Sequence, residues 1–169
     1  MALCGGLLIY VVREAACEWR WNHAYRRYYK HRHEKTLERY DRLYPSLNRN
    51  KYFLYNYAFA AYRMHDAGKA YRIVKECVKL RRDYNTELLS ADICWKLGRY
   101  EEAIRHYDEA RHMCPVRFAP LEGLYRVYEE IGDSLNMTIT AEAIATKKVK
   151  VNSSDVIRIK KTANKSTNE

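Results

Sequence analysis

The side chains best suited to metal chemistry lie in the segment YYKHRHEK, residues 28–35, which contains His31 and His33. Two histidines that are two residues apart on a helix point to different faces, so they cannot share a metal ion without a turn between them. The cysteines form no CxxC pair and have no histidine at zinc-ligand spacing. We expect them to be small buried hydrophobic residues, although in an oxidising compartment one pair could bridge. We therefore expect no metal site and no cofactor. The five cysteines are Cys4, Cys17, Cys77, Cys94 and Cys114.

The sequence contains no motif for catalysis. It has no GxxxxGK[ST] or GxGxxG loop for phosphates and no GxSxG nucleophile turn. Acidic pairs such as Glu101 and Glu102 are typical of the exposed face of a helix, and nothing predicts two carboxylates across a cleft. We expect that the chain is not an enzyme and that it has no catalytic residues.

The chemistry that remains is recognition, by aromatic platforms and charged hydrogen-bonding side chains that suit a peptide or a glycan. In a stack of helical hairpins, the first helix of each hairpin lines a concave groove. For any single aromatic residue, packing between repeats is the alternative interpretation. The candidate groove residues are Trp21, Tyr25, Tyr28, Tyr55, Tyr62, Asp92, Trp95, Lys96 and Arg126.

Length and composition predict one helical domain. The chain has 169 residues, of which 47% are hydrophobic, so it can bury a core. Six glycines and three prolines leave little material for the turns of an all-β fold. The formal net charge of +10 indicates attraction to polyanions, such as nucleic acid, anionic lipid or acidic polysaccharide. We do not expect nucleic-acid binding, because the positive charge is dispersed among carboxylates and forms no continuous stripe.

An internal repeat sets the element order. The segments HDAGKAYRIVKECVKL (65–80), WKLGRYEEAIRHYDEA (95–110) and EEIGDSLNMTITAEAI (129–144) align on their glycines. Gly98 and Gly132 lie 34 residues apart, which is the period of tetratricopeptide repeats. Gly68 precedes Gly98 by only 30 residues, so we expect a shortened repeat there.

The middle copy assigns a structural role to each repeat residue. Gly98 is expected to end the first helix in a left-handed conformation, which costs glycine little. Ala103 and Ala110 lie seven residues apart on one helical face and let two helices approach closely, with Tyr100 and Tyr107, again seven residues apart, filling the space beside them. Pro115 is expected to stop the second helix.

The predicted fold is all-α, a tetratricopeptide-type solenoid of helical hairpins with about 3.5 to 4 repeats and a C-terminal capping helix. A degenerate first copy runs from about Cys17 to Pro45, with His31 where the turn glycine would be. The capping helix begins at Ser153 or Ser154. The predicted organisation is an apolar segment over residues 1–12, the repeat domain over 13–160 and a polar tail over 161–169.

The first twelve residues, MALCGGLLIYVV, carry no charge and are too few to cross a bilayer as a helix. Aromatic and basic residues follow immediately, as in the interfacial belt of a membrane protein. We expect this segment to be the last half of a transmembrane helix. A buried first helix is the alternative.

Three further segments carry a family resemblance. YDRLYPSLNRNKYFLYNYA (40–58), LGRYEEAIRHYDEARHMCPVRFAPLEGLYRVYEEIGD (97–133) and KKVKVNSSDVIRIK (147–160) resemble the C-terminal region of bacterial O-antigen ligase family membrane proteins. The resemblance covers roughly residues 19–160, and MCPVRFAPL is its most specific part. Prolines that usually flank the VKV element in that family are replaced by Lys148 and Asn152.

The resemblance implies a non-catalytic scaffold on the periplasmic side of a membrane, in the assembly of cell-surface lipopolysaccharide. The family's glycosyl-transferring membrane domain is absent from this sequence, so no catalytic residue can be transferred. The expected partners are a protein or a polysaccharide in the groove, and an anionic membrane surface. The alternative is a free-standing cytoplasmic repeat protein that binds peptide or nucleic acid. The sequence leaves open the partner's identity, the oligomeric state and whether the chain is a fragment.

Overall fold

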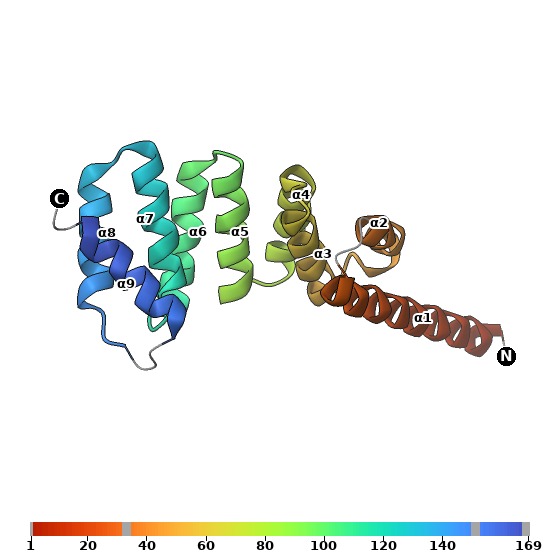
Figure 1. Cartoon of the computed structure of the whole chain (residues 1–169). Helices are drawn as coiled ribbons and strands as arrows, with labels where there is room; N and C mark the ends of the chain where they lie inside the picture. Colours follow the sequence, from red (N-terminus) through yellow and green to blue (C-terminus); the bar gives the residue numbers. More distant parts are fainter. Residues whose placement is uncertain (1, 32–34, 150–152, 167–169) are drawn as a thin grey trace. The chain divides into compact units, whose positions relative to one another are not determined.

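The computed structural model describes residues 2–31, 35–149 and 153–166, and it describes the side chains of these residues except at 2–8, 10, 14, 27–31, 165 and 166. Within these ranges every regular element is a helix, which confirms the predicted fold class (Figure 1). The helices are α1 (Ala2–His31), α2 (Lys35–Leu47), α3 (Lys51–Arg63), α4 (Ala67–Leu80), α5 (Tyr84–Lys96), α6 (Tyr100–Met113), α7 (Ala119–Ile131), α8 (Ser134–Thr146) and α9 (Ser154–Ser166).

The chain forms two compact units, each with its own internal contacts. Unit 1 spans Met1–Arg81 and contains α1 to α4, in which α1 pairs with α2 and α3 pairs with α4. Unit 2 spans Arg82–Glu169, in which α5 pairs with α6, α7 packs between α6 and α8, and α9 covers α8. Antiparallel helix pairs of this kind are the hairpins of tetratricopeptide-type repeats.

The turns inside three hairpins share a left-handed residue at a regular spacing. His65, Gly98 and Gly132 have φ values of 64°, 69° and 73°, respectively. They lie 33 and 34 residues apart, so the repeat before Gly98 has normal length. The predicted alignment on Gly68 is therefore wrong, since Gly68 lies inside α4. Asp66 follows the true turn and caps α4 by accepting a hydrogen bond from the Lys69 amide at 3.0 Å.

Replacing His65 by glycine should stabilise unit 1 by about 0.5–1 kcal/mol. A side chain at positive φ destabilises the folded chain by about 1–2 kcal/mol. Glycine removes this cost, but part of the gain is lost because glycine has more conformational freedom in the unfolded chain. His65 is exposed, so no buried contact is lost. Urea denaturation of the two proteins measures the difference. Replacing Gly98 by alanine should have the opposite sign, and the same sign for both changes would contradict the turn assignment.

The first hairpin differs from its prediction at both ends. The apolar segment 1–12 and the basic segment that follows belong to one continuous helix, α1, so no element boundary separates them. The first copy was expected to run to about Pro45, but α2 continues through this proline to Leu47. A proline in the last turn removes only one hydrogen bond, and buried Leu43 and Leu47 hold this turn against its neighbours.

The core of unit 2 confirms the packing that the repeat predicted. Ala103 and Ala110 are completely buried between α6 and its neighbours, and Tyr107 is buried beside them. Tyr100 was expected to fill the same space but is only half-buried, and its hydroxyl donates to Glu130 Oε1 at 3.0 Å.

Cys94 is buried on α5, as expected of a cysteine that acts as a small hydrophobic residue, whereas Cys114 is only half-buried. Pro115 follows the end of α6, as expected.

The C-terminal helix is longer than predicted. Ser153 is its N-cap, since the Val156 amide donates to the Ser153 hydroxyl at 3.3 Å. The predicted polar tail begins at residue 161, but α9 continues to Ser166 and Ala163 is buried. Ile159 and Ala163 pack on a cluster formed by α7, its N-cap residue and α8, which explains why this stretch stays helical. The cluster contains Phe118, Leu121, Tyr125, Ala141 and Ile144.

The N-terminal segment was predicted to be part of a transmembrane helix. Within the described part of the chain, no helix combines the length and the apolar character that crossing a bilayer requires.

Candidate interaction surface

The predicted groove residues lie on the first helix of each hairpin, as the repeat register predicts. They divide between the two units, and each group is described within its own unit. The side chain of Tyr28 lies outside those that the structure describes. The described ones are Trp21 and Tyr25 on α1, Tyr55 and Tyr62 on α3, Asp92, Trp95 and Lys96 on α5, and Arg126 on α7.

In unit 2, Tyr107 of α6 holds Asp92 of α5 by a hydrogen bond. The Tyr107 hydroxyl donates a hydrogen bond to Asp92 Oδ1 at 2.6 Å. Burial raises the pKa of the Asp92 carboxyl above its ordinary value, and the Tyr107 hydrogen bond and the Arg126 charge offset part of this rise. The Tyr107 ring itself fits only because residue 123 on α7 is glycine: a Cβ there would lie 2.2 Å from Tyr107 Cε1.

A second set of contacts joins α5 to α7 around Trp95. The Arg126 guanidinium lies 5.1 Å from the centroid of the Trp95 ring, a cation–π arrangement. The Trp95 indole nitrogen donates to Glu130 Oε2 at 2.5 Å, and the Tyr100 hydroxyl donates to Glu130 Oε1 at 3.0 Å. These contacts fix the Trp95 ring and the Arg126 guanidinium in place where α5 lies beside α7.

The edge of this surface is charged. Lys96 follows Trp95 at the end of α5 and is exposed. Glu122 forms an ion pair with Arg158 of α9, with 2.7 Å between Glu122 Oε1 and the guanidinium nitrogen. The α5–α7 surface, defined by Asp92, Trp95, Lys96, Arg126 and Glu130, therefore presents both charge signs around an aromatic ring.

In unit 1, two of the predicted residues line a recess between α1 and α3. Its volume is about 400 Å³. The Trp21 ring meets Phe53 edge-on at a centroid distance of 5.9 Å. Tyr55 stacks on Phe59 of its own helix at 6.4 Å and is not among the lining residues. The recess is lined by Glu18, Trp21, Asn22, Tyr25, Tyr52 and Asn56.

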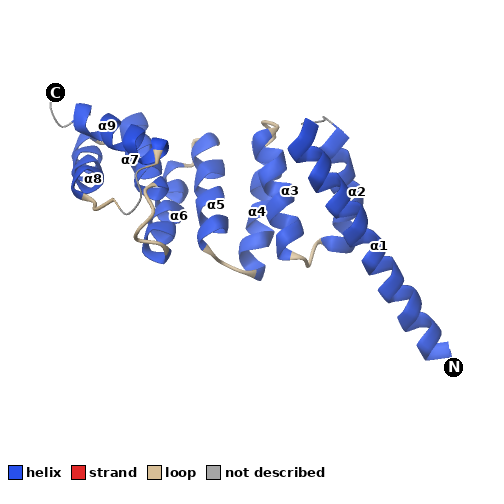
Figure 2. Cartoon of the chain, turned by 60° about the horizontal axis from the view of Figure 1, so that its bottom comes forward, coloured by secondary structure: helices blue, strands red, loops and turns tan. Residues whose placement is uncertain are grey.

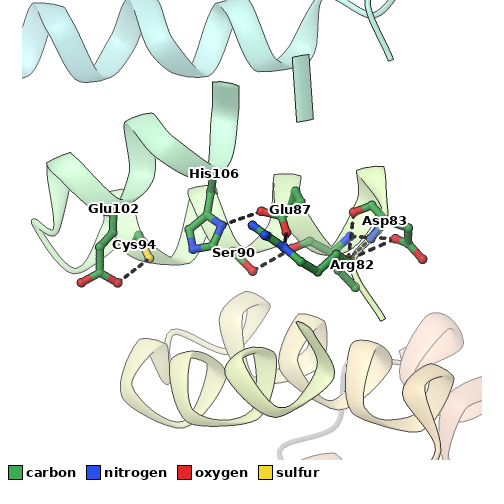
Figure 3. Close-up of polar contacts among 8 residues, drawn as sticks. Arg82, Asp83, Glu87, Ser90, Cys94, Glu102 and His106 are labelled. Atoms are coloured by element: carbon green, nitrogen blue, oxygen red, sulfur yellow. Dashed lines mark hydrogen bonds and ion pairs between the residues drawn. The ribbon is translucent and has the colours of Figure 1, made fainter. Parts of the chain in front are cut away.

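Sequence reasoning missed a fully buried charge in unit 2. The Glu87 carboxylate is 0% exposed and accepts from Arg82 Nε at 2.7 Å, and it lies 2.6 Å from His106 Nδ1. Figure 3 shows Arg82 and His106 on either side of Glu87. The signal was available, because Glu87 lies four and seven residues before Ala91 and Cys94, on the buried face of α5.

The Glu87 cluster is a structural brace. Burial alone would raise the pKa of Glu87, but the hydrogen bonds and positive charges of His106 and Arg82 hold the pKa below its ordinary value of 4.5. The capping box at Asp83 and Thr86 begins α5 directly beside it, with the Thr86 amide 3.1 Å from Asp83 Oδ1. The Glu87 carboxylate has no exposed surface, so a substrate cannot reach it. The cluster therefore has a structural role, which is to stabilise the start of α5.

Metal binding was considered at His31 and His33, whose side chains lie outside those described. Among the residues that are described, no group of three or more His, Cys, Asp or Glu side chains is arranged to hold a metal ion.

Residues 30–110 match a family model described as anaphase-promoting complex, cyclosome, subunit 3. The match covers 81 of the 169 residues and identifies a tetratricopeptide-type repeat region. It carries no link to the O-antigen ligase family, so that resemblance stays a prediction. Among curated proteins, none matches the chain.

Proposed function

We propose that the chain is a non-catalytic interaction scaffold that binds an extended peptide segment of a partner protein on the α5–α7 surface. The observation that carries this proposal is the arrangement of Arg126 over the Trp95 ring, with Glu130 holding the indole nitrogen. Tetratricopeptide-type repeats are typically scaffolds for protein partners, which supports the choice of ligand.

The α5–α7 surface suits a peptide because its polar groups are held in advance. The Trp95 ring offers a flat apolar area. The Asp92 carboxyl can accept hydrogen bonds from a peptide, and Lys96 and Arg126 can donate them to its backbone or its charged side chains. Tyr107 of α6 holds Asp92 and Glu130 of α7 holds Trp95, so these two side chains lose little conformational entropy when a peptide binds.

Selection from a phage-displayed library of random peptides against the full chain tests this function. Selected peptides should bind roughly tenfold more weakly to Arg126→Gln or Lys96→Gln, since each change removes a charged hydrogen-bond donor. Arg105→Gln is the matched control, because Arg105 is exposed on α6. Failure to select any peptide, or equal losses at Arg105 and Arg126, would overturn the proposal.

A second candidate function rests on the resemblance of residues 97–133 and 147–160 to the O-antigen ligase family. In this proposal the scaffold lies at a membrane surface, faces the periplasm and holds polysaccharide during lipopolysaccharide assembly. The aromatic recess of Trp21, Tyr25 and Tyr52 supports it, because aromatic rings stack on sugar faces. Titration with released O-polysaccharide should produce binding that Trp21→Leu weakens. Peptide binding without polysaccharide binding would favour the first candidate.

A further inference from the structure

A basic recess lies between α1 and α2 in unit 1. It has a volume of about 500 Å³, and Arg13 and Arg20 of α1 face it together with Arg42 of α2. Every described residue that lines it is neutral or basic. The arginines are exposed, and the ion pair recorded for Arg42 is a long one, 3.9 Å to Glu38. Three guanidinium groups around one hollow suit an anion with several oxygens, such as a phosphate.

The positive surface continues into a second, shallower recess on the same two helices. It shares Arg20 and Arg42 with the first recess and adds Arg39. Trp19 lines it, is 70% exposed and stacks on His23 at 5.8 Å. An exposed tryptophan among arginines is typical of the interface between lipid headgroups and water.

The helix that carries these arginines has an apolar N-terminal end. Ile9, Val11 and Val12 are all exposed, and they point to different sides of α1 because successive residues turn by about 100°. Figures 1 and 2 show this end of α1 extending past α2, with none of the described helices of unit 1 beside it. A helix end that is apolar on several sides is stable only when something apolar covers it.

We propose that this surface docks unit 1 on a membrane, with the end of α1 in the hydrocarbon and the phosphate of an anionic phospholipid in the recess of Arg13, Arg20 and Arg42. Residues 2–12 extend about 16 Å along the helix, roughly half of a hydrocarbon core of about 30 Å. Arg13 then lies at the level where the hydrocarbon ends. Arg20 lies about 10 Å further along the axis, a few ångströms beyond a headgroup layer of about 5–7 Å, and its long side chain can extend back to the phosphates.

Continuity between the two features is the reason for choosing a lipid as the occupant. A soluble phosphate would use the arginines and leave Ile9 and Val12 in water. A phospholipid satisfies both, because its headgroup and its chains are joined in one molecule. This inference rests on the membrane-surface part of the second candidate function and names the residues that recognise the lipid.

Co-sedimentation of the full chain with vesicles tests the inference. Vesicles of phosphatidylcholine with phosphatidylglycerol should bind the chain, and the triple variant Arg13→Gln, Arg20→Gln, Arg42→Gln should bind them at least tenfold more weakly. The control triple variant Arg49→Gln, Arg63→Gln, Arg105→Gln removes the same charge from exposed positions elsewhere and should stay within about twofold. Ile9→Asn with Val12→Asn should weaken binding to vesicles of either composition.

The other outcomes separate the parts of the inference. Equal losses in both triple variants would mean that only net charge matters, which overturns the recess. Unchanged binding in the recess triple variant, with loss in the Ile9 and Val12 variant, would overturn the recess and leave membrane association standing. Displacement by inorganic phosphate at millimolar concentration would identify a soluble anion as the ligand. Failure to bind any vesicle would overturn both the recess and the membrane location.

Discussion

Replacing Gly123 by alanine lowers the free energy of unfolding of unit 2 by about 3 kcal/mol. The added Cβ would lie 2.2 Å from Tyr107 Cε1 and 2.3 Å from Cζ, far inside van der Waals contact. The ring cannot turn away easily, since Tyr107 is buried and its hydroxyl is bonded to Asp92 at 2.6 Å. Either α7 moves away from α6 or Tyr107 leaves Asp92. Urea denaturation followed by circular dichroism measures the loss.

Gly68→Ala is the matched control for this change. Gly68 is also helical, at the start of α4, but a Cβ there would meet nothing within 4 Å. The substitution should stabilise the chain by up to about 0.5–1 kcal/mol, as replacing glycine by alanine in a helix normally does. A stabilising effect at both positions would contradict the packing argument for Gly123.

A double-mutant cycle identifies Tyr107 as the cause. In a Tyr107→Ala background the ring is absent, so Gly123→Ala should cost little or even help. The single change at Gly123 should also weaken peptide binding, because Asp92 on the α5–α7 surface is held by the Tyr107 hydroxyl. A cost at Gly123 that is the same with and without the Tyr107 ring would exclude this coupling.

The sequence predicted those parts of the fold that depend on local rules. Gly98 ends its helix at φ 69°, and the buried positions of Ala103 and Ala110 follow from helical periodicity. Asp92, Trp95 and Arg126 meet because a regular repeat brings first helices of successive hairpins side by side. Each of these statements needs only residue type and spacing.

The features that sequence reasoning missed depend on tertiary context. The turn at His65 has a positive φ but no glycine, so an alignment on glycines could not locate it. Gly123 lies inside a helix, where sequence alone indicates a weak helix former and not a close contact with Tyr107. Glu87 was not singled out from the sequence, because only the folded chain places His106 of α6 beside its carboxylate, opposite Arg82.

The second large effect concerns this buried carboxylate. Replacing Glu87 by glutamine should lower the free energy of unfolding at neutral pH by about 2 kcal/mol, because two charge-assisted hydrogen bonds are lost inside unit 2. The loss stays below that of a fully buried pair, since Arg82 is 52% exposed and can be solvated again. Glu101→Gln on the exposed face of α6 is the control and should change the free energy by less than about 0.5 kcal/mol.

The pH dependence distinguishes lost charge from lost packing at Glu87. Its pKa in the folded chain lies below 4.5, so the folded state favours the ionised carboxylate, and this stabilisation is fully present above the unfolded value. It falls as the pH drops below 4.5 and through the folded pKa, where the carboxylate takes up a proton in both states. The difference between wild type and Glu87→Gln, measured by urea denaturation at several pH values, should therefore shrink below pH 4.5. A difference that stays constant down to acid pH would mean that Glu87 acts through its shape, and the brace would then not be electrostatic.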